Sequence, residues 1–298
     1  MSAMKWATST LVVAVAMVLG ISSAWAGPHD LQLSRFLDFE EDEVADDDRV
    51  WGSAAGNDQL FDDFVRQFGQ VMAPRPGAPA ETLGQAGFGV KISTSLSDIP
   101  AGEEQWTTAA EGRNPAAMLF TSQLQVRKGL PFSFEVGGNL THLGASQIFA
   151  MGADLRWALH EGYAYFPDIA ARGSVNTVVG APELNMVNAS WDISMSKSFG
   201  VAGVMNLTPY LGYQQLYTIA STRVLNAYPQ DPRPPQTLSR DGQRDLHFAP
   251  EYVFGQRTHQ INRFFGGLRL NTWILSFTLE ALIGEEINQF SLITGVEF

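Results

Sequence analysis

Residues 149–160 read Phe-Ala-Met-Gly-Ala-Asp-Leu-Arg-Trp-Ala-Leu-His, and apolar side chains alternate with small or polar ones along most of this stretch. The odd-numbered positions, from Phe149 to Leu159, are all apolar, whereas the even-numbered positions include Asp154, Arg156 and His160. Successive side chains of a β-strand point to opposite faces of a sheet. A period of two therefore predicts a strand with one apolar and one polar face.

The same period recurs from about residue 83 to the C-terminus. It predicts about ten strands of the 9–11 residues that a tilted membrane strand needs, within a range of about eight to twelve, and an even number is expected for a single-chain barrel. The predicted strands lie near residues 87–97, 118–127, 132–141, 149–160, 168–179, 187–195, 206–217, 263–271, 273–280 and 290–298.

The polar face of these strands carries the charges, and the other face is almost free of them. Only 17% of the chain is charged, against about a quarter in soluble globular proteins. No later segment holds the ~18 consecutive apolar residues of a membrane-spanning helix. An all-β, antiparallel up-and-down transmembrane β-barrel with a polar interior accounts for both observations. The expected lumen-lining residues are Glu135, Asp154, Arg156, Arg172, Asp192, Arg269 and Glu280.

These seven side chains have two interpretations. They pair across strands and fill a narrow interior, or they line a pore and bias the passage of solutes. A barrel of about ten strands is narrow, because about eight strands nearly fill their interior and general porins use about sixteen or more.

The first 26 residues predict an export signal. Lys5 precedes a short apolar core at residues 11–21, and Ala24 and Ala26 flank Trp25 at the expected cleavage point. The chain has no cysteine, which excludes disulfides, thiolate metal sites, a cysteine nucleophile and a lipid-modified cysteine. Its net charge of −12 argues against a nucleic-acid partner.

Residues 27–80 form an acidic extension without alternation. Residues 30–63 hold twelve acidic and two basic residues, so we expect a largely flexible chain. A calcium loop would need a turn glycine and a closing glutamate in the acidic run at 38–48, and these are absent. Residues 60–72 predict an amphipathic helix, which Asp58 is placed to cap. Four roles are open for this helix: it plugs the barrel, it lies on the membrane surface, it binds a partner, or it packs under the barrel. Prolines 74, 76 and 79 then indicate a domain boundary before a barrel at 83–298.

The connections between predicted strands alternate in length. If both ends of the barrel lie in the periplasm, the connections on that side, near residues 128–131, 160–167, 198–202 and 271–272, are short. The opposite side receives the long stretches 99–115 and 221–257. Short periplasmic turns and longer extracellular loops are typical of such barrels, and we expect the extension to be periplasmic.

The last strand carries apolar residues at Phe290, Leu292, Val296 and the terminal Phe298, with Thr294 interrupting the row. In this feature the chain resembles bacterial outer-membrane β-barrel proteins. The resemblance covers residues 83–298 and the export signal, and it does not point to a subfamily. The resemblance implies a Gram-negative outer-membrane location and assembly by the barrel-assembly machinery, which reads this terminal pattern. It also implies contact with outer-membrane lipids and lipopolysaccharide. The arginines of 221–257 either meet lipopolysaccharide phosphates or belong to a solvated loop.

The sequence predicts the function less directly than the fold. We expect a non-catalytic barrel, structural or porin-like with a narrow solute channel or binding role, and no cofactor or metal. One alternative is a barrel enzyme acting on lipid or surface peptide, with His142, His160, His247 or His259 beside a nucleophile, although no Gly-x-Ser-x-Gly motif is present. A second alternative is a soluble periplasmic β-protein.

Overall fold

The structure is a computed structural model that describes residues 27–42, 51–110, 115–163, 165–201, 203–226, 236–238, 244–246 and 251–298. The expected export signal at 1–26, His247 and part of the acidic run lie outside these residues. The N-terminal elements are a 3-10 turn η1 (Leu33–Phe36), β1 (Leu37–Asp42), β2 (Trp51–Gly56) and α2 (Asp58–Met72). Short elements in later connections are α3 (Glu104–Ala109), β9 (Phe199–Val201), β11 (Leu225–Asn226), β12 (Gln236–Leu238), β13 (Arg244–Leu246) and β14 (Glu251–Tyr252).

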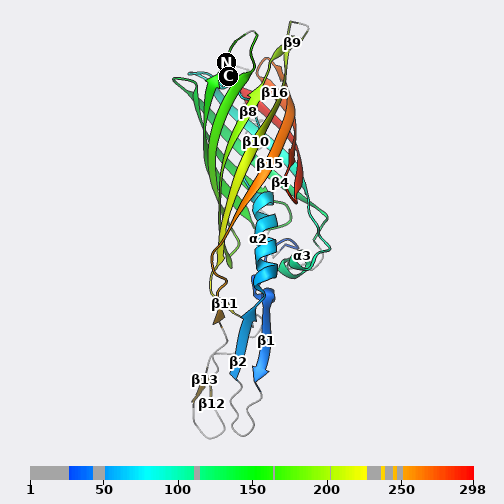
Figure 1. Cartoon of the computed structure of the whole chain (residues 1–298), viewed down its shortest axis with the longest axis vertical. Helices are drawn as coiled ribbons and strands as arrows, with labels where there is room; N and C mark the ends of the chain where they lie inside the picture. The colour runs from blue at the N-terminus through cyan, green and yellow to red at the C-terminus, as the bar shows by residue number, and fades with distance from the viewer. Residues whose placement is uncertain are drawn as a thin grey trace, which may run out of the picture.

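Ten long strands form a closed antiparallel barrel, as the sequence predicts (Figure 1). They are β3 (Phe88–Asp98), β4 (Met118–Leu130), β5 (Phe134–Leu143), β6 (Phe149–His160), β7 (Asp168–Val179), β8 (Leu184–Ser196), β10 (Met205–Thr222), β15 (Arg257–Thr272), β16 (Leu275–Ile283) and β17 (Asn288–Glu297). The first strand β3 pairs with the last strand β17 from Asp98↔Asn288 to Gly89↔Glu297, and this seam closes the barrel. Closure leaves no barrel strand with an unpaired edge.

The two faces of the wall differ as the alternation predicts. Inward positions are buried, and many are polar or charged, whereas outward positions expose large apolar side chains such as Leu279 and Phe264, each 62% exposed. Along the ten barrel strands, the only charged residues at outward positions are Asp98 and Lys128, both at or near a strand end. The exterior is therefore an apolar belt of the kind that faces lipid.

The two ends of the barrel also differ. The connections at the end that holds Phe298, which we call the short-turn end, include the three residues between β4 and β5 and the two between β15 and β16. The opposite end, which we call the long-connection end, carries the connections at 99–117 and 223–256. Figure 1 shows α2 and the β1–β2 hairpin at the end of the barrel away from the C-terminus.

The extension lies at one end of the barrel. The structure places it at the long-connection end, where the Leu33 N–H donates to Glu183, the Gln32 N–H to the Ala109 carbonyl and the His29 N–H to the Ala145 carbonyl. The reason is that the chain between α2 and β3 runs the length of the barrel interior before the first strand begins. The periplasmic location of the extension stays a prediction.

Helix α2 occupies the predicted position. Its N-cap is Asn57, whose side chain accepts from the Leu60 N–H at 3.2 Å, so Asp58 is the first helical residue and not the cap. Its apolar side chains, including Phe61, Phe64 and Phe68, join a buried cluster with residues of η1 and of the long connections. Among the described helices, none is long and apolar enough to cross a membrane.

Closure by the β3–β17 seam yields a first prediction. A chain truncated after Gly284 lacks β17 and leaves β3 and β16 with unpaired edges. We expect it to lose the compact form that migrates differently before and after boiling in mild-detergent electrophoresis. Leu96→Ala, which removes only an outward side chain on β3, should keep that form. A truncated chain that still shifts on boiling would contradict this closure.

Candidate functional site

The seven expected lumen-lining residues all lie on the interior face of the wall. Each is buried, with no more than 4% of its surface exposed. Three further inward cations, Lys91, Arg127 and Arg263, were not among our candidates. Each of them stands at a polar position within one of the predicted strands. The same period-two pattern, applied to every strand, is the signal that identifies them.

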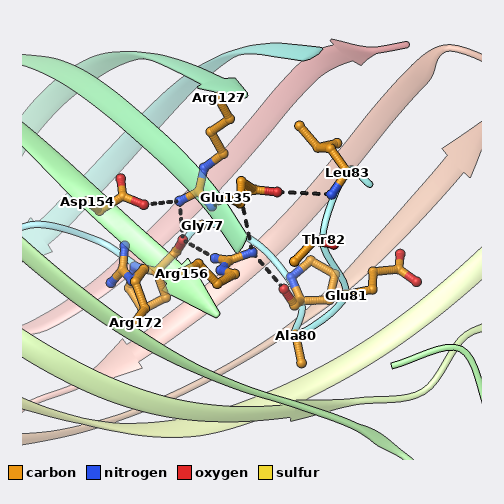
Figure 2. A network of polar contacts seen from close by, with 12 residues as sticks. Gly77, Ala80, Glu81, Thr82, Leu83, Arg127, Glu135, Asp154, Arg156 and Arg172 are labelled. Carbon is orange, nitrogen blue, oxygen red and sulfur yellow. Dashed lines mark hydrogen bonds and ion pairs between the residues drawn. The ribbon is translucent and has the colours of Figure 1, made fainter. Parts of the chain in front are cut away.

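Part of this set forms a charged ladder across neighbouring strands (Figure 2). Arg127 on β4 contacts Glu135 on β5 at 2.5 Å and Asp154 on β6 at 3.3 Å. Arg156 lies 3.8 Å from Glu135. Since ions buried in a low-dielectric interior are costly unless they are paired, these contacts explain how the wall tolerates so many charges.

A second ion pair lies on the next strands. Arg172 on β7 contacts Asp192 on β8 at 2.7 Å. The same guanidinium also donates to a backbone carbonyl, that of Arg75, at 2.6 Å. Arg75 belongs not to the wall but to residues 73–83, which we call the luminal segment.

The luminal segment binds the wall through its carbonyl oxygens. Arg156 donates to Pro79 O at 2.8 Å, and Arg263 donates to Pro74 O at 3.3 Å. Longer contacts of 3.5 Å join Arg127 and Arg156 to Pro76 O. Hydrogen bonds to charged donors are stronger than neutral ones. The three prolines that we interpreted as a boundary are thus part of the lumen filling. They supply acceptors without adding backbone N–H groups that would need partners.

Four backbone N–H groups of the segment donate to side chains of the wall and of the β6–β7 connection. Gly77 N–H donates to Glu280 at 2.9 Å, Ala80 N–H to Ser196 Oγ at 3.1 Å and Leu83 N–H to Glu135 at 3.0 Å. Thr82 N–H donates to Glu161 at 2.9 Å. Donors and acceptors of the segment therefore meet complementary groups along its path, as buried backbone requires.

The C-terminal end of α2 enters the barrel and is capped by the wall. The last carbonyls of a helix have no partner within the helix. Here Gln70 O accepts from Gln289 at 3.0 Å and from Arg263 at 3.2 Å, and Met72 O accepts from Asn176 at 2.7 Å. Side chains from β17, β15 and β7 thus hold the end of the helix from three directions.

The side chains of the segment add two further links. The Arg75 guanidinium, 3% exposed, donates to Ser95 Oγ at 2.5 Å and also to Thr121 Oγ1. Glu81 forms an ion pair with Arg269 on β15. The recess beside Arg75, bounded by Lys91 and Gln125 among others, is too tight to hold a water molecule. The lumen is therefore filled at this level.

The histidines lie outside this network. His142 meets the carbonyl of Ser146, while the Ser146 hydroxyl donates to the Leu143 carbonyl and not to the imidazole. His160 meets the Pro167 carbonyl, and His259 lies 3.3 Å from Asp62 of α2. Within the described residues, no group of three or more His, Cys, Asp or Glu is placed to hold a metal ion.

No family model matches the chain, and no curated protein sequence matches it. Among solved structures it is similar to Ail of Yersinia pestis, at 10% identity and a TM-score of 0.27 over 72% of this chain and 99% of that chain. It is similar to a KdgM porin at 8% identity and a TM-score of 0.33, over 70% and 99% of the two chains. It is also similar to the β domain of the Bordetella autotransporter Brka, at 13% identity and a TM-score of 0.32, over 72% of this chain and 99% of that chain. These structural neighbours are outer-membrane β-barrel proteins.

The Arg172 contacts yield a second prediction. Arg172→Met leaves Asp192 buried without its cation and removes a donor to Arg75 O. Breaking one side of a buried ion pair costs about 3–5 kcal/mol, so we expect the free energy of unfolding in detergent to fall by about that amount. Arg223→Met is the control, because Arg223 is exposed and loses one 3.3 Å contact with Asn185.

The double variant Arg172→Met with Asp192→Leu separates the two contributions. It removes the orphaned carboxylate and should recover most of the lost stability, leaving the smaller cost of the missing donor to the luminal segment. Equal stability of the wild type and Arg172→Met in denaturant titrations would show that this network does not hold the segment.

Proposed function

We propose that the chain is a non-catalytic outer-membrane β-barrel whose lumen is closed by its own N-terminal segment, so that it acts as a structural anchor and not as an open pore. The observation that carries the proposal is the matched set of hydrogen bonds between the luminal segment and the wall. A channel that is open at rest would leave those wall arginines facing water. Here they bind backbone instead.

The exterior supports the membrane part of the proposal. Soluble proteins rarely expose a continuous apolar patch of more than a few hundred Å². This barrel exposes large apolar side chains on all ten strands, with outward charges only near strand ends. A soluble periplasmic protein, one of our alternatives, would leave that belt in water. Lipids are therefore the proposed partner of the belt.

The belt yields a third prediction. Leu279 is outward, 62% exposed, and lies in the middle of β16. Leu279→Arg should cost about 2–4 kcal/mol of stability in a lipid bilayer, the usual effect of arginine near the midplane of a barrel. Leu279→Val is the control. The measurement is denaturant unfolding in vesicles, and an unchanged stability of Leu279→Arg would contradict a lipid-facing position.

A fourth prediction tests the closed lumen. In planar bilayers the wild-type protein should show no stable conductance steps. Gly69 of α2 touches the wall so closely that a Cβ there would lie 2.4 Å from Thr218 Oγ1. Gly69→Leu should push the helix away from the wall and give conductance steps.

Two comparisons make this test decisive. Gln59→Leu changes an exposed position on the same helix and should stay silent. The boiling-dependent mobility shift must be present in each variant, so that silence is not due to misfolding. Steady conductance of the wild-type protein would overturn the closed-lumen proposal in favour of the narrow channel.

The barrel is also proposed to have two kinds of partner and no catalytic role. The outward apolar residues of β17 support recognition by the barrel-assembly machinery. Lipopolysaccharide is the proposed partner of the long-connection end. Against the enzyme alternative stand the contacts of His142 and His160, each of which has one ring nitrogen against a backbone carbonyl and not against a hydroxyl nucleophile.

A further inference from the structure

The chain passes through its own barrel. Residues 27–42 and 51–56 and most of α2 lie at the long-connection end, yet β3 begins with Phe88 at the short-turn end, where its N–H donates to Phe298 O. Between them, contacts with the wall mark the path in order. Met72 O meets Asn176, Gly77 N–H meets Glu280 and Thr82 N–H meets Glu161 in the β6–β7 connection.

The length of the connecting chain fits this path. The fifteen residues from Ala73 to Gly87 span at most about 50 Å when extended. A strand of thirteen residues such as β4 is about 44 Å long along its own axis and less along the barrel axis, because it is tilted. The segment therefore reaches from one end to the other, with a few residues left for the turn at Gly84, whose φ is +73°.

The end that receives the extension is built around it. The buried cluster that joins α2 to η1 includes Trp106 of α3, Ile148 of the β5–β6 connection and Phe254 before β15. Phe61 stacks on Phe254 with ring centroids 4.5 Å apart, and Phe64 meets Trp106 at 5.4 Å. We call residues 27–72 together with these connections the head. The long connections bury apolar side chains of the extension, so the head would lose its core if the extension lay elsewhere.

The sidedness of such barrels supplies the last step. Short turns face the periplasm and long connections face outward. This step rests on the outer-membrane location proposed above. We infer that residues 27–72 are delivered through the lumen and displayed on the cell surface as the head. The luminal segment is the part of the chain that remains in the lumen after this passage. The barrel is then the export route for its own N-terminal region, a function beyond closing the pore.

Single cysteines test this topology cleanly, because the chain has none of its own. Gln59→Cys reports on the extension, Gly102→Cys on the long-connection end and Tyr165→Cys on the short-turn end, and all three positions are exposed. A Cβ at Gly102 meets nothing within 4 Å. The probe is a membrane-impermeant maleimide applied to intact cells and to permeabilised cells.

Each pattern of labelling has one meaning. We expect Gln59→Cys and Gly102→Cys to label in intact cells to the same extent, and Tyr165→Cys to label only after permeabilisation. Labelling of Gly102→Cys without Gln59→Cys would overturn the display of the extension while leaving the barrel orientation intact. Labelling of Tyr165→Cys alone in intact cells would reverse the orientation and overturn the inference. Loss of the boiling-dependent shift would instead count against the proposed barrel itself.

A cross-link tests the passage through the lumen independently. The Ala80 N–H lies 3.1 Å from Ser196 Oγ on the inner face of β8. Ala80→Cys with Ser196→Cys should form a disulfide on oxidation, detected by mass spectrometry of the joined peptides. Ala80→Cys with Ser122→Cys is the matched control, because Ser122 stands at an outward position of β4. A disulfide in the control pair, or none in the Ser196 pair of a heat-modifiable protein, would place the segment outside the barrel.

Discussion

The structure depends on the requirement that buried guanidinium groups find acceptors. Arg263 is fully buried, and in the part of the chain that the structure describes it forms no ion pair with a carboxylate. Its acceptors are the carbonyls of Gln70 and Pro74 and the side chain of Gln214. An unpaired buried cation is costly. The wall and the segment that fills it are therefore one unit, since two of the three acceptors of Arg263 are backbone carbonyls of α2 and the luminal segment.

The strand pattern of the barrel follows from the sequence because it is local. An alternating stretch such as 149–160 indicates which residues face inward without any knowledge of its neighbours. Seven of the buried wall charges were predicted in this way, whereas Lys91, Arg127 and Arg263 were not. The path of residues 73–83 is not local. Prolines 74, 76 and 79 end a helix in any context, and whether the next residues form a linker or fill a lumen depends on partners on β6, β7 and β15. The end of the barrel at which the extension lies depends on the same non-local contacts.

One signal in the extension does carry non-local information. The helix at 58–72 has a wide apolar face and is followed by Ala73 and the first of the prolines, and a helix that is only solvated does not need seven large apolar side chains. The cap at Asn57 sets where it begins. What the sequence does not state is which surface covers that face, because the long connections that do so show no periodic pattern of their own.

The direction of the bonds around the luminal segment has a mechanical consequence. The donors of Arg156, Arg172 and Arg263 reach the segment from the wall, across the barrel axis, while the segment runs along it. A pull on the head along the axis would load these bonds side by side in shear, not one after another as in an unzipping hairpin. At the long-connection end the aromatic cluster around α2 is wider than the chain that follows it. Such a pull would therefore have to break several of these bonds at once before the segment could slide through the barrel.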